Sequence, residues 1–218
     1  MIQPADAPFP ERMDKAVLRE LPLLAFSGTI ELIDDALLDE ALADLRRIRV
    51  LGFDTESKPT FRRQDEVRPP ALLQLATGKR AWLFPLRKIT RHADLFTILA
   101  DPEIRKVGVA PHDDIKGLNR ISSFTAAGFV DLGVIAAQKG IITTGLRNLA
   151  GMFLHGRISK AAQVSNWEQN PLTSKQIAYA ATDAWVSLRI YEELNRRKGR
   201  AVPAEQGQGE PTTSAGRP

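Results

Sequence analysis

Strand-like and helix-like segments alternate along the middle of this chain, and that alternation restricts the folds that it can adopt. Short apolar runs predict strands at residues 29–33, 50–53, 72–76, 81–84, 107–109 and 129–131. The spacing of apolar residues predicts helices at 35–46, 90–100, from about 111, and at 132–138, 145–153 and 173–197. Early strands that include a hairpin, followed by crossover helices and a helical end, are typical of an α/β domain built on a mixed sheet.

The two ends of the chain differ from this middle part in composition. Residues 1–26 mix proline with a short apolar patch at 21–26, and we expect them to form an arm that packs on the domain. Residues 27–198 are expected to form the domain itself. Residues 199–218 contain four glycines and three prolines. We expect them to be disordered, because such a segment buries too little surface to offset the entropy of ordering it.

Composition excludes several classes of protein. The chain has no cysteine, which removes disulfides, thiolate zinc sites, iron–sulfur clusters and cysteine nucleophiles. No apolar run approaches the roughly 18 residues of a transmembrane helix, and the first residues lack the pattern of a signal peptide. We therefore expect a cytoplasmic protein without a membrane partner. The net charge of +4 points only weakly to an anionic partner, because residues 196–218 carry five basic and two acidic residues and the rest is nearly neutral.

Two acidic residues directly follow one of the predicted strands. Asp54 and Glu56 come after the apolar run at 50–53, and residues two apart on a strand point to the same side. Two carboxylates held that close repel each other unless a cation lies between them, and divalent cations such as Mg²⁺ prefer oxygen ligands. The pair is either part of a metal site or an exposed Asp-Thr-Glu turn, and this segment alone favours the turn.

A second acidic pair follows the predicted strand at 107–109. Asp113 and Asp114 fall in the first turn of the next predicted helix, where negative charge interacts favourably with the helix dipole. Helix capping explains this pair without any function. If one of the two belongs to a site, Asp114 is the candidate, with Asp113 as a cap or an outer group.

The predicted C-terminal helix carries Tyr179 and Asp183, four residues apart. That spacing places both side chains on one face of the helix. The two residues that follow Tyr179 are alanines, which allow another backbone to approach closely. The alternative is an ordinary amphipathic helix with Tyr179 at the edge of the core and Asp183 in solvent. Thr173 is the candidate N-cap of this helix.

Taken together, these segments resemble the DEDD superfamily of 3′–5′ exonucleases, in its tyrosine-containing branch. The resemblance rests on three motifs, which are Asp54 with Glu56, Asp114 with Leu118, and Tyr179 with Asp183. The branch includes ribonuclease D, the proofreading domain of bacterial DNA polymerase I and the Werner-type exonuclease domain, to which the resemblance is closest. Supporting stretches lie at residues 107–109, 165–167, 171–173 and 179–184.

The resemblance implies a fold, a reaction and a set of site residues. The fold is the ribonuclease H-like mixed sheet flanked by helices, also called the DnaQ-like exonuclease fold. The reaction is hydrolysis of the terminal phosphodiester of a nucleic acid with two divalent ions, Mg²⁺ or Mn²⁺, which releases 5′-nucleotides. The implied metal ligands are Asp54, Glu56, Asp114 and Asp183, with Asp54 shared by both ions, and Tyr179 is implied to orient the attacking water.

The second motif departs from the pattern of the family at one position. The family often has an asparagine four residues before the aspartate, and this chain has Ala110 there, with His112 nearby. Further candidates for contact with the substrate are Thr55, Lys58, Arg62, Arg63, Arg68, Lys160 and Trp167. Basic side chains contact phosphates and aromatic ones stack on bases. The alternatives are a solvated loop or surface for the cations and core packing for Trp167.

Three functions follow from these observations. The leading one is an exonuclease that acts on DNA, either single-stranded or with recessed 3′ ends. The second is an RNA-processing or oligoribonucleotide exonuclease, because groups that sense the 2′-hydroxyl decide between the two substrates and no motif reveals them. The third is a non-catalytic nucleic-acid-binding module, although such a module has no need of four mutually repelling acids.

Overall fold

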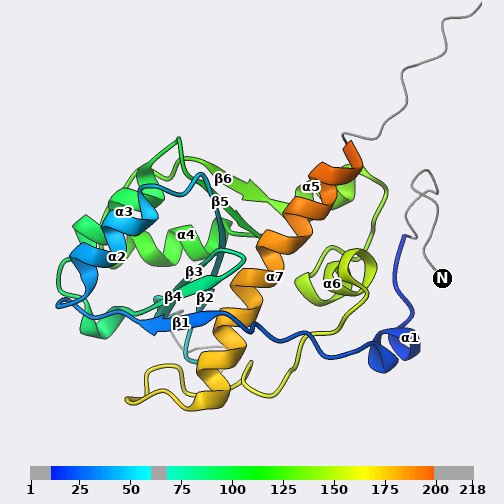
Figure 1. Cartoon of the computed structure of the whole chain (residues 1–218), viewed down its shortest axis with the longest axis horizontal. Coiled ribbons are helices and arrows are strands. Elements are labelled where there is room, and N and C mark those ends of the chain that lie inside the picture. The colour runs from blue at the N-terminus through cyan, green and yellow to red at the C-terminus, as the bar shows by residue number, and fades with distance from the viewer. Residues whose placement is uncertain (1–10, 60–67, 199–218) are drawn as a thin grey trace, which may run out of the picture.

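The computed structural model describes residues 11–59 and 68–198. Within these residues, six strands form one mixed sheet in the order β1-β4-β3-β2-β5-β6 (Figure 1). The strands are β1 (Thr29–Leu32), β2 (Val50–Glu56), β3 (Leu72–Ala76), β4 (Arg80–Pro85), β5 (Arg105–Gly108) and β6 (Phe129–Asp131). Strand β3 pairs antiparallel with both of its neighbours, whereas the other pairings are parallel.

Helices cover both faces of this sheet. The helices of the described residues are α1 (Lys15–Glu20), α2 (Leu38–Leu45), α3 (His92–Ala100), α4 (His112–Asn119), α5 (Leu132–Gln138), α6 (Leu146–Leu154) and α7 (Ser174–Lys198), with a short 3₁₀ helix η1 (Leu86–Lys88). Helices α2, α3 and α4 share one apolar cluster with the sheet. Helix α7 crosses the opposite face, and α5 and α6 pack on it (Figure 1). No helix in the described ranges has the length and apolar character that a membrane span requires.

The alternation of side chains along β2 assigns its residues to two different layers. Leu51 and Phe53 are buried in the cluster on the α2 and α3 side. Gly52 faces α7 instead, where the sheet meets a row of small residues on that helix, namely Ala180, Ala181 and Ala184. Because these side chains are small, α7 lies close to the sheet, as the two alanines after Tyr179 suggested.

The predicted elements are all present, with differences at their ends. Strand β2 continues through Glu56, so Asp54 and Glu56 lie on the strand and the alternative of an exposed turn is wrong. The helix predicted from residue 35 begins at Leu38, because the Asp34 carboxylate accepts hydrogen bonds from the next backbone N–H groups and forms a turn. Strand β5 begins at Arg105, two residues earlier than predicted, and helix α1 was not predicted.

Residues 11–26, the described part of the expected arm, lie against α6 and α7. The N–H of Leu24 donates to the carbonyl of Arg157 at 2.8 Å, and the N–H of Phe26 donates to the Thr182 hydroxyl at 3.1 Å. Residues 1–10 and the expected disordered tail at 199–218 lie outside the described residues. The domain boundaries at 27 and 198 stay a prediction.

Candidate active site

Gly52 allows α7 to lie against β2 at the point where the acidic residues begin. A Cβ atom at position 52 would stand 1.9 Å from the backbone oxygen of Ala184, so only glycine permits this approach of the two backbones. Asp54 lies two residues further along β2 on the same side, and Asp183 directly precedes Ala184. The contact between Gly52 and Ala184 therefore brings Asp183 to the side chain of Asp54.

Asp54, Glu56 and Asp183 form one acidic group. Each offers a carboxylate oxygen, and these atoms all lie within 4.8 Å of one another. Asp183 is only 5% exposed, and its Oδ1 atom is buried without a hydrogen-bond partner. A buried carboxylate oxygen without a donor is costly, and a divalent cation held among oxygen ligands removes that cost. The three residues therefore fit a divalent metal ion with a preference for oxygen.

Burial and mutual repulsion raise the pKa values of these acids. Burial, followed by the charge of Asp183, raises the pKa of Asp54 well above its usual range. Burial, reinforced by the charge of Asp54, raises the pKa of Glu56 to about 10. Burial also raises the pKa of Asp183, although the Tyr179 hydroxyl and the Arg147 guanidinium both lower it. Shifts of this kind are expected where carboxylates need a bound cation in order to ionise together.

Asp114, from the first turn of α4, lies beside this group. The Thr55 hydroxyl donates a 2.5 Å hydrogen bond to Asp114 Oδ1. Burial raises the pKa of Asp114 to about 6 although this hydrogen bond lowers it, and the charge of Asp114 in turn raises the pKa of Asp54. The Asp113 side chain, in contrast, is 90% exposed and pairs with Lys116. No side chain caps the N-terminus of α4, so Asp113 is a surface residue.

The position where the family often has asparagine is a strained one in this chain. Ala110, between β5 and α4, has a φ of 51°, a left-handed conformation that asparagine adopts more readily than alanine. The Ala110 N–H donates to Asp131 Oδ1 at 3.0 Å, and the same carboxylate caps α5. His112 is exposed on α4. Asp131 thus fixes the loop that leads to Asp114.

Tyr179 lies one turn before Asp183 and is 8% exposed. Burial, followed by the charges of Asp183 and Glu56, raises the pKa of the Tyr179 hydroxyl. The hydroxyl is therefore protonated at neutral pH. Trp167 packs against Tyr179 with the ring centroids 6.0 Å apart. The alternative in which Asp183 faces solvent is wrong, since Asp183 is buried together with Tyr179.

Helix α7 starts with a reciprocal pair of hydrogen bonds that also fixes the segment before it. The Gln176 N–H donates to Thr173 Oγ1 at 3.2 Å, and the Thr173 N–H donates to Gln176 Oε1 at 2.9 Å. This is a capping box with Thr173 as the predicted N-cap. The Gln176 amide nitrogen also donates to Ser165 Oγ at 3.0 Å and to the Asn166 carbonyl at 3.2 Å. The segment that carries Trp167 is thereby attached to the start of α7.

The other predicted substrate contacts occupy different surroundings. Trp167 is 2% exposed, so the core-packing alternative describes its position and its ring has no free face for a base. The Thr55 hydroxyl donates its hydrogen bond to Asp114, as described above. Lys58 forms an ion pair with Glu168 at 3.4 Å, and Lys160 is exposed. Arg62 and Arg63 lie outside the described residues.

Two residues that lie near the acidic group were not identified from the sequence. Gln74 lies opposite Asp54 in the β2–β3 pairing and is fully buried, with neither side-chain amide atom hydrogen-bonded. Its only signal is a polar residue inside the apolar run 72–76. Arg147, in the first turn of α6, donates to Gln163 Oε1 at 2.9 Å, and its charge lowers the pKa of Asp183. No pattern in the sequence separates Arg147 from other surface cations.

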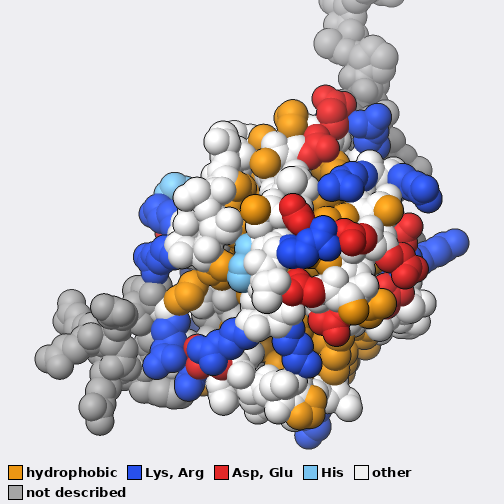
Figure 2. Space-filling view, turned by 90° about the vertical axis from the view of Figure 1, so that its left-hand side faces the viewer, with side chains coloured by type: hydrophobic (Ala, Val, Ile, Leu, Met, Phe, Trp, Pro, Cys, Tyr) orange, Lys and Arg blue, Asp and Glu red, His pale blue; other side chains and the backbone are white. Residues whose placement is uncertain are grey.

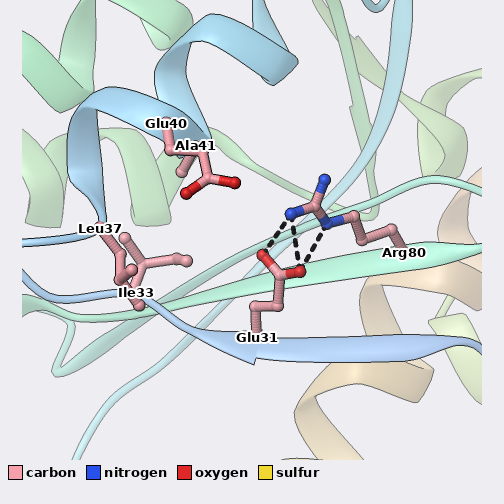
Figure 3. Close-up of a pocket in the computed structure, with 6 residues that line it drawn as sticks. All are labelled: Glu31, Ile33, Leu37, Glu40, Ala41 and Arg80. Carbon is pink, nitrogen blue, oxygen red and sulfur yellow. Dashed lines mark hydrogen bonds and ion pairs between the residues drawn. The ribbon is translucent and has the colours of Figure 1, made fainter.

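A pocket on the α2 side of the sheet contains none of the predicted site residues (Figure 3). It is lined by Glu31, Ile33, Leu37, Glu40, Ala41 and Arg80. Arg80 spans from β4 to Glu31 on the edge strand β1 and to Asp44 on α2, and its guanidinium lies over the Trp82 ring. These contacts join three elements, which gives the residues a structural role.

The mixed sheet, the crossing helix α7 and the acidic group between them define a class of protein. The family model described as "3′-5′ exonuclease" matches residues 30–198 of this chain, and the chain belongs to this family. The match confirms the resemblance to the DEDD superfamily and, together with the solved relatives, the predicted ribonuclease H-like fold. It also covers every residue of the acidic group.

Individual relatives come from animals and bacteria. The chain is 34% identical over 163 residues to the "Exonuclease 3′-5′ domain-containing protein 2" of Drosophila melanogaster, covering 73% of this chain and 27% of the relative. It is 31% identical over 193 residues to the mouse "Bifunctional 3′-5′ exonuclease/ATP-dependent helicase WRN", covering 84% of this chain and 14% of the relative. The crystal structure of Escherichia coli RNase D, "an exoribonuclease involved in structured RNA processing", superposes with a TM-score of 0.70 at 25% identity, over 78% of this chain and 45% of that one. The chain thus spans less than half of each of these relatives.

Proposed function

We propose that this chain is a metal-dependent 3′–5′ exonuclease of the tyrosine-containing branch, which hydrolyses the terminal phosphodiester of a nucleic acid strand and releases 5′-nucleotides. The observation that carries the proposal is the meeting of Asp54, Glu56 and Asp183 within 4.8 Å, with one buried carboxylate oxygen lacking any donor. A group of this kind is costly unless it binds a cation. The position of Tyr179 one turn before Asp183 supports the assignment to the branch.

The ligand set indicates which ions the site takes. Asp54, Glu56 and Asp183 would hold one divalent ion, and Asp54 with Asp114 a second. Carboxylate oxygens without thiolates suit Mg²⁺ or Mn²⁺. When bound, such ions activate a water molecule at neutral pH and stabilise the leaving 3′-oxygen. Thr55 holds the Asp114 carboxylate in place through its 2.5 Å hydrogen bond.

Tyr179 contributes by orientation rather than by removing a proton. Its pKa is raised by burial and by neighbouring carboxylates, so at neutral pH the hydroxyl keeps its proton and is a poor base. A protonated hydroxyl beside the acidic group can fix the attacking water through a hydrogen bond. We therefore assign to Tyr179 the positioning of the nucleophile, and to the carboxylates the binding of the ions.

We propose DNA as the substrate, single-stranded or with a recessed 3′ end. RNA is the second candidate, and it is supported by the similarity to E. coli RNase D, which is itself described as an exoribonuclease. The test uses 5′-labelled single-stranded DNA, recessed duplex DNA and single-stranded RNA of matched sequence, each with Mg²⁺ or Mn²⁺. Faster shortening of either DNA supports the proposal. Faster shortening of RNA contradicts the choice of DNA and leaves the reaction in place.

Replacement of Tyr179 by Phe tests the role of the hydroxyl. Loss of the hydrogen bond to the attacking water should lower kcat by at least ~100-fold, while the Mg²⁺ concentration for half-maximal activity stays unchanged. The chain offers a matched control, since Tyr191→Phe alters the other of its two tyrosines, three turns further along α7. A Tyr179→Phe variant as fast as Tyr191→Phe would show that the hydroxyl has no part in the reaction.

A further inference from the structure

Three cations surround one carboxylate close to the acidic group. Glu168 Oε1 lies 2.8 Å from Arg87 Nη2 and 3.3 Å from Arg68 Nη1, and Glu168 Oε2 lies 3.4 Å from Lys58 Nζ. The Glu168 side chain is 14% exposed, whereas that of Arg87 is 66% exposed. The carboxylate is therefore covered, and the cations present their charge to solvent. We call Lys58, Arg68, Arg87 and Glu168 the basic cluster.

The fold places the basic cluster at the end of the sheet that carries Glu56. Glu56 lies opposite Leu72 on β3, and Leu72 lies opposite Pro85 on β4. Adjacent strands are about 4.8 Å apart, so these three strand ends lie side by side within about 10 Å. Lys58 and Arg87 each follow one of these ends by two residues, and Arg68 precedes the third by four.

Glu168 connects the basic cluster to the other wall of the site. It follows Trp167, which packs against Tyr179, and Gln176 attaches the same segment to the start of α7. The cluster is therefore linked to the acidic group in two ways, since Lys58 follows Glu56 by two residues and Glu168 follows the tryptophan that packs on Tyr179. A nucleic acid strand whose 3′ end lies at Asp54 would run past it.

The balance of charge in the basic cluster differs from that of other ion pairs on the described surface. Arg80 pairs with two carboxylates, Glu31 and Asp44, and Arg91 pairs with Asp39 and Asp94. In the basic cluster the ratio is reversed, because Glu168 is the one carboxylate among the described residues that pairs with Lys58, Arg68 and Arg87. Lys and Arg side chains also predominate at the lower left of the face shown in Figure 2, and mix with acidic ones further right. One cation is enough to neutralise the Glu168 carboxylate, so pairing with Glu168 alone does not explain the assembly of three cations.

We propose that the basic cluster binds the phosphodiester backbone of the substrate strand, on the 5′ side of the nucleotide that is removed. Guanidinium groups bind phosphate oxygens through paired hydrogen bonds, and an ammonium group binds them as a point charge. Glu168 keeps the three cations together when no strand is bound. The inference rests on the proposed exonuclease function and adds to it a binding site for the single-stranded part of the substrate.

The test compares a long substrate with one that cannot reach the basic cluster. The long substrate is a single-stranded 12-nucleotide DNA, and the short one is the p-nitrophenyl ester of thymidine 5′-monophosphate, which has one phosphodiester and no upstream phosphate. The variants are Arg87→Gln and Arg68→Gln. The control is Arg49→Gln, which removes the same charge from an exposed ion pair with Glu103 at the opposite end of β2.

Each cluster variant should lower kcat/KM on the 12-nucleotide strand at least ~5-fold at low salt, through KM. The slope of log kcat/KM against log salt concentration should become shallower by about 0.7 for each phosphate that the variant no longer binds. Hydrolysis of the ester should stay within twofold of wild type, as should both activities of Arg49→Gln. Cluster variants that match Arg49→Gln on the strand overturn the proposal, and so does an equal loss on both substrates, which would place the effect at the reacting nucleotide.

Binding without hydrolysis separates this proposal from the proposed function. If the wild-type protein cleaves neither substrate, the exonuclease proposal fails, and fluorescence anisotropy of the labelled 12-nucleotide strand in EDTA still examines the basic cluster. Weaker binding by Arg87→Gln than by Arg49→Gln supports the cluster as a backbone site. Equal binding by the two variants overturns it.

Discussion

Asp54, Glu56 and Asp183 destabilise the fold that brings them together. Burial and neighbouring negative charge raise the pKa of Asp54 and of Glu56, and burial raises the pKa of Asp183. In the absence of a cation, these groups therefore favour their neutral forms. A divalent ion reverses this preference, because it replaces repulsion among carboxylates by attraction to one centre.

We predict that the metal-free protein loses stability as the pH rises. An acid with a higher pKa in the folded than in the unfolded state binds more protons when folded, so its stabilising effect is complete below the unfolded pKa and declines above it. For Asp114, whose pKa rises from 3.8 to about 6, stability declines across that pH range, and for Glu56, whose pKa rises from 4.5 to about 10, it declines from pH 4.5 to about pH 10. In EDTA, the melting temperature should be at least ~4 °C lower at pH 8 than at pH 5.

Thermal unfolding with and without Mg²⁺ measures this effect. Mg²⁺ should raise the melting temperature more at pH 8 than at pH 5, because its ligands must be deprotonated. Asp54→Asn removes one of the interacting acids, so its pH dependence in EDTA should be weaker than that of wild type. If the melting temperatures of wild type and Asp54→Asn depend on pH in the same way, the acidic group is not the cause of the loss of stability at high pH.

At the scale of elements, the contact between β2 and α7 determines whether the site exists. We predict that Gly52→Ala abolishes activity and lowers the free energy of unfolding by about 1–3 kcal/mol, because the new methyl group meets the Ala184 carbonyl and forces α7 away from the strand. Displacement of α7 carries Asp183 away from Asp54. The measurements are the exonuclease rate and chemical denaturation.

Gly78→Ala is the matched control for this substitution. Gly78 lies in the turn between β3 and β4, and an added Cβ atom there meets nothing within 4 Å. Its effect should stay within about 0.5 kcal/mol, with activity retained. A Gly52→Ala variant with wild-type activity would show that close approach of α7 is not needed for the site.

The sequence predicts the elements of this fold better than the contacts between them. Apolar periodicity predicts β6 and α5 at the bounds that the structure shows, and Thr173 is confirmed as the N-cap of α7. These features depend on neighbouring residues only. Periodicity does not encode the contacts that determine the sheet order or that bring Asp54 to Asp183, 129 positions away in the sequence. The meeting of these two aspartates was predicted only from the combined motifs.

Two residues illustrate why the remainder was not predicted. Lys106 is fully buried within β5, although lysine is rarely buried. Its Nζ donates to the carbonyls of Asp101 and Ile104 at 2.7 and 2.6 Å, and those acceptors are placed by a turn that the pattern does not define. Gly52 has no signal of its own in the sequence, because its importance comes from the Ala184 backbone on a helix far away in the sequence.

At the scale of the whole molecule, the acidic group and the basic cluster both lie near the end of the sheet that carries Glu56. The acidic group lies between β2 and α7, and the basic cluster borders it. In the proposed binding mode, the cations of the basic cluster would attract a negatively charged strand beside the acidic group and would lower the local repulsion. The family relatives contain further segments beyond the matched region, and the choice of substrate, like the expected cytoplasmic location, stays a prediction.

The central claim is that Asp54, Glu56 and Asp183 bind the divalent ions that hydrolyse a nucleic acid from its 3′ end. The most direct measurement follows a 5′-labelled single strand with wild-type protein and Asp54→Ala, in Mg²⁺ and in EDTA. The account predicts that wild type in Mg²⁺ produces a ladder of products that shortens from the 3′ end. In EDTA the strand should stay intact, and Asp54→Ala in Mg²⁺ should degrade it at least ~1,000-fold more slowly than wild type. Equal degradation by wild type and a folded Asp54→Ala variant would contradict it.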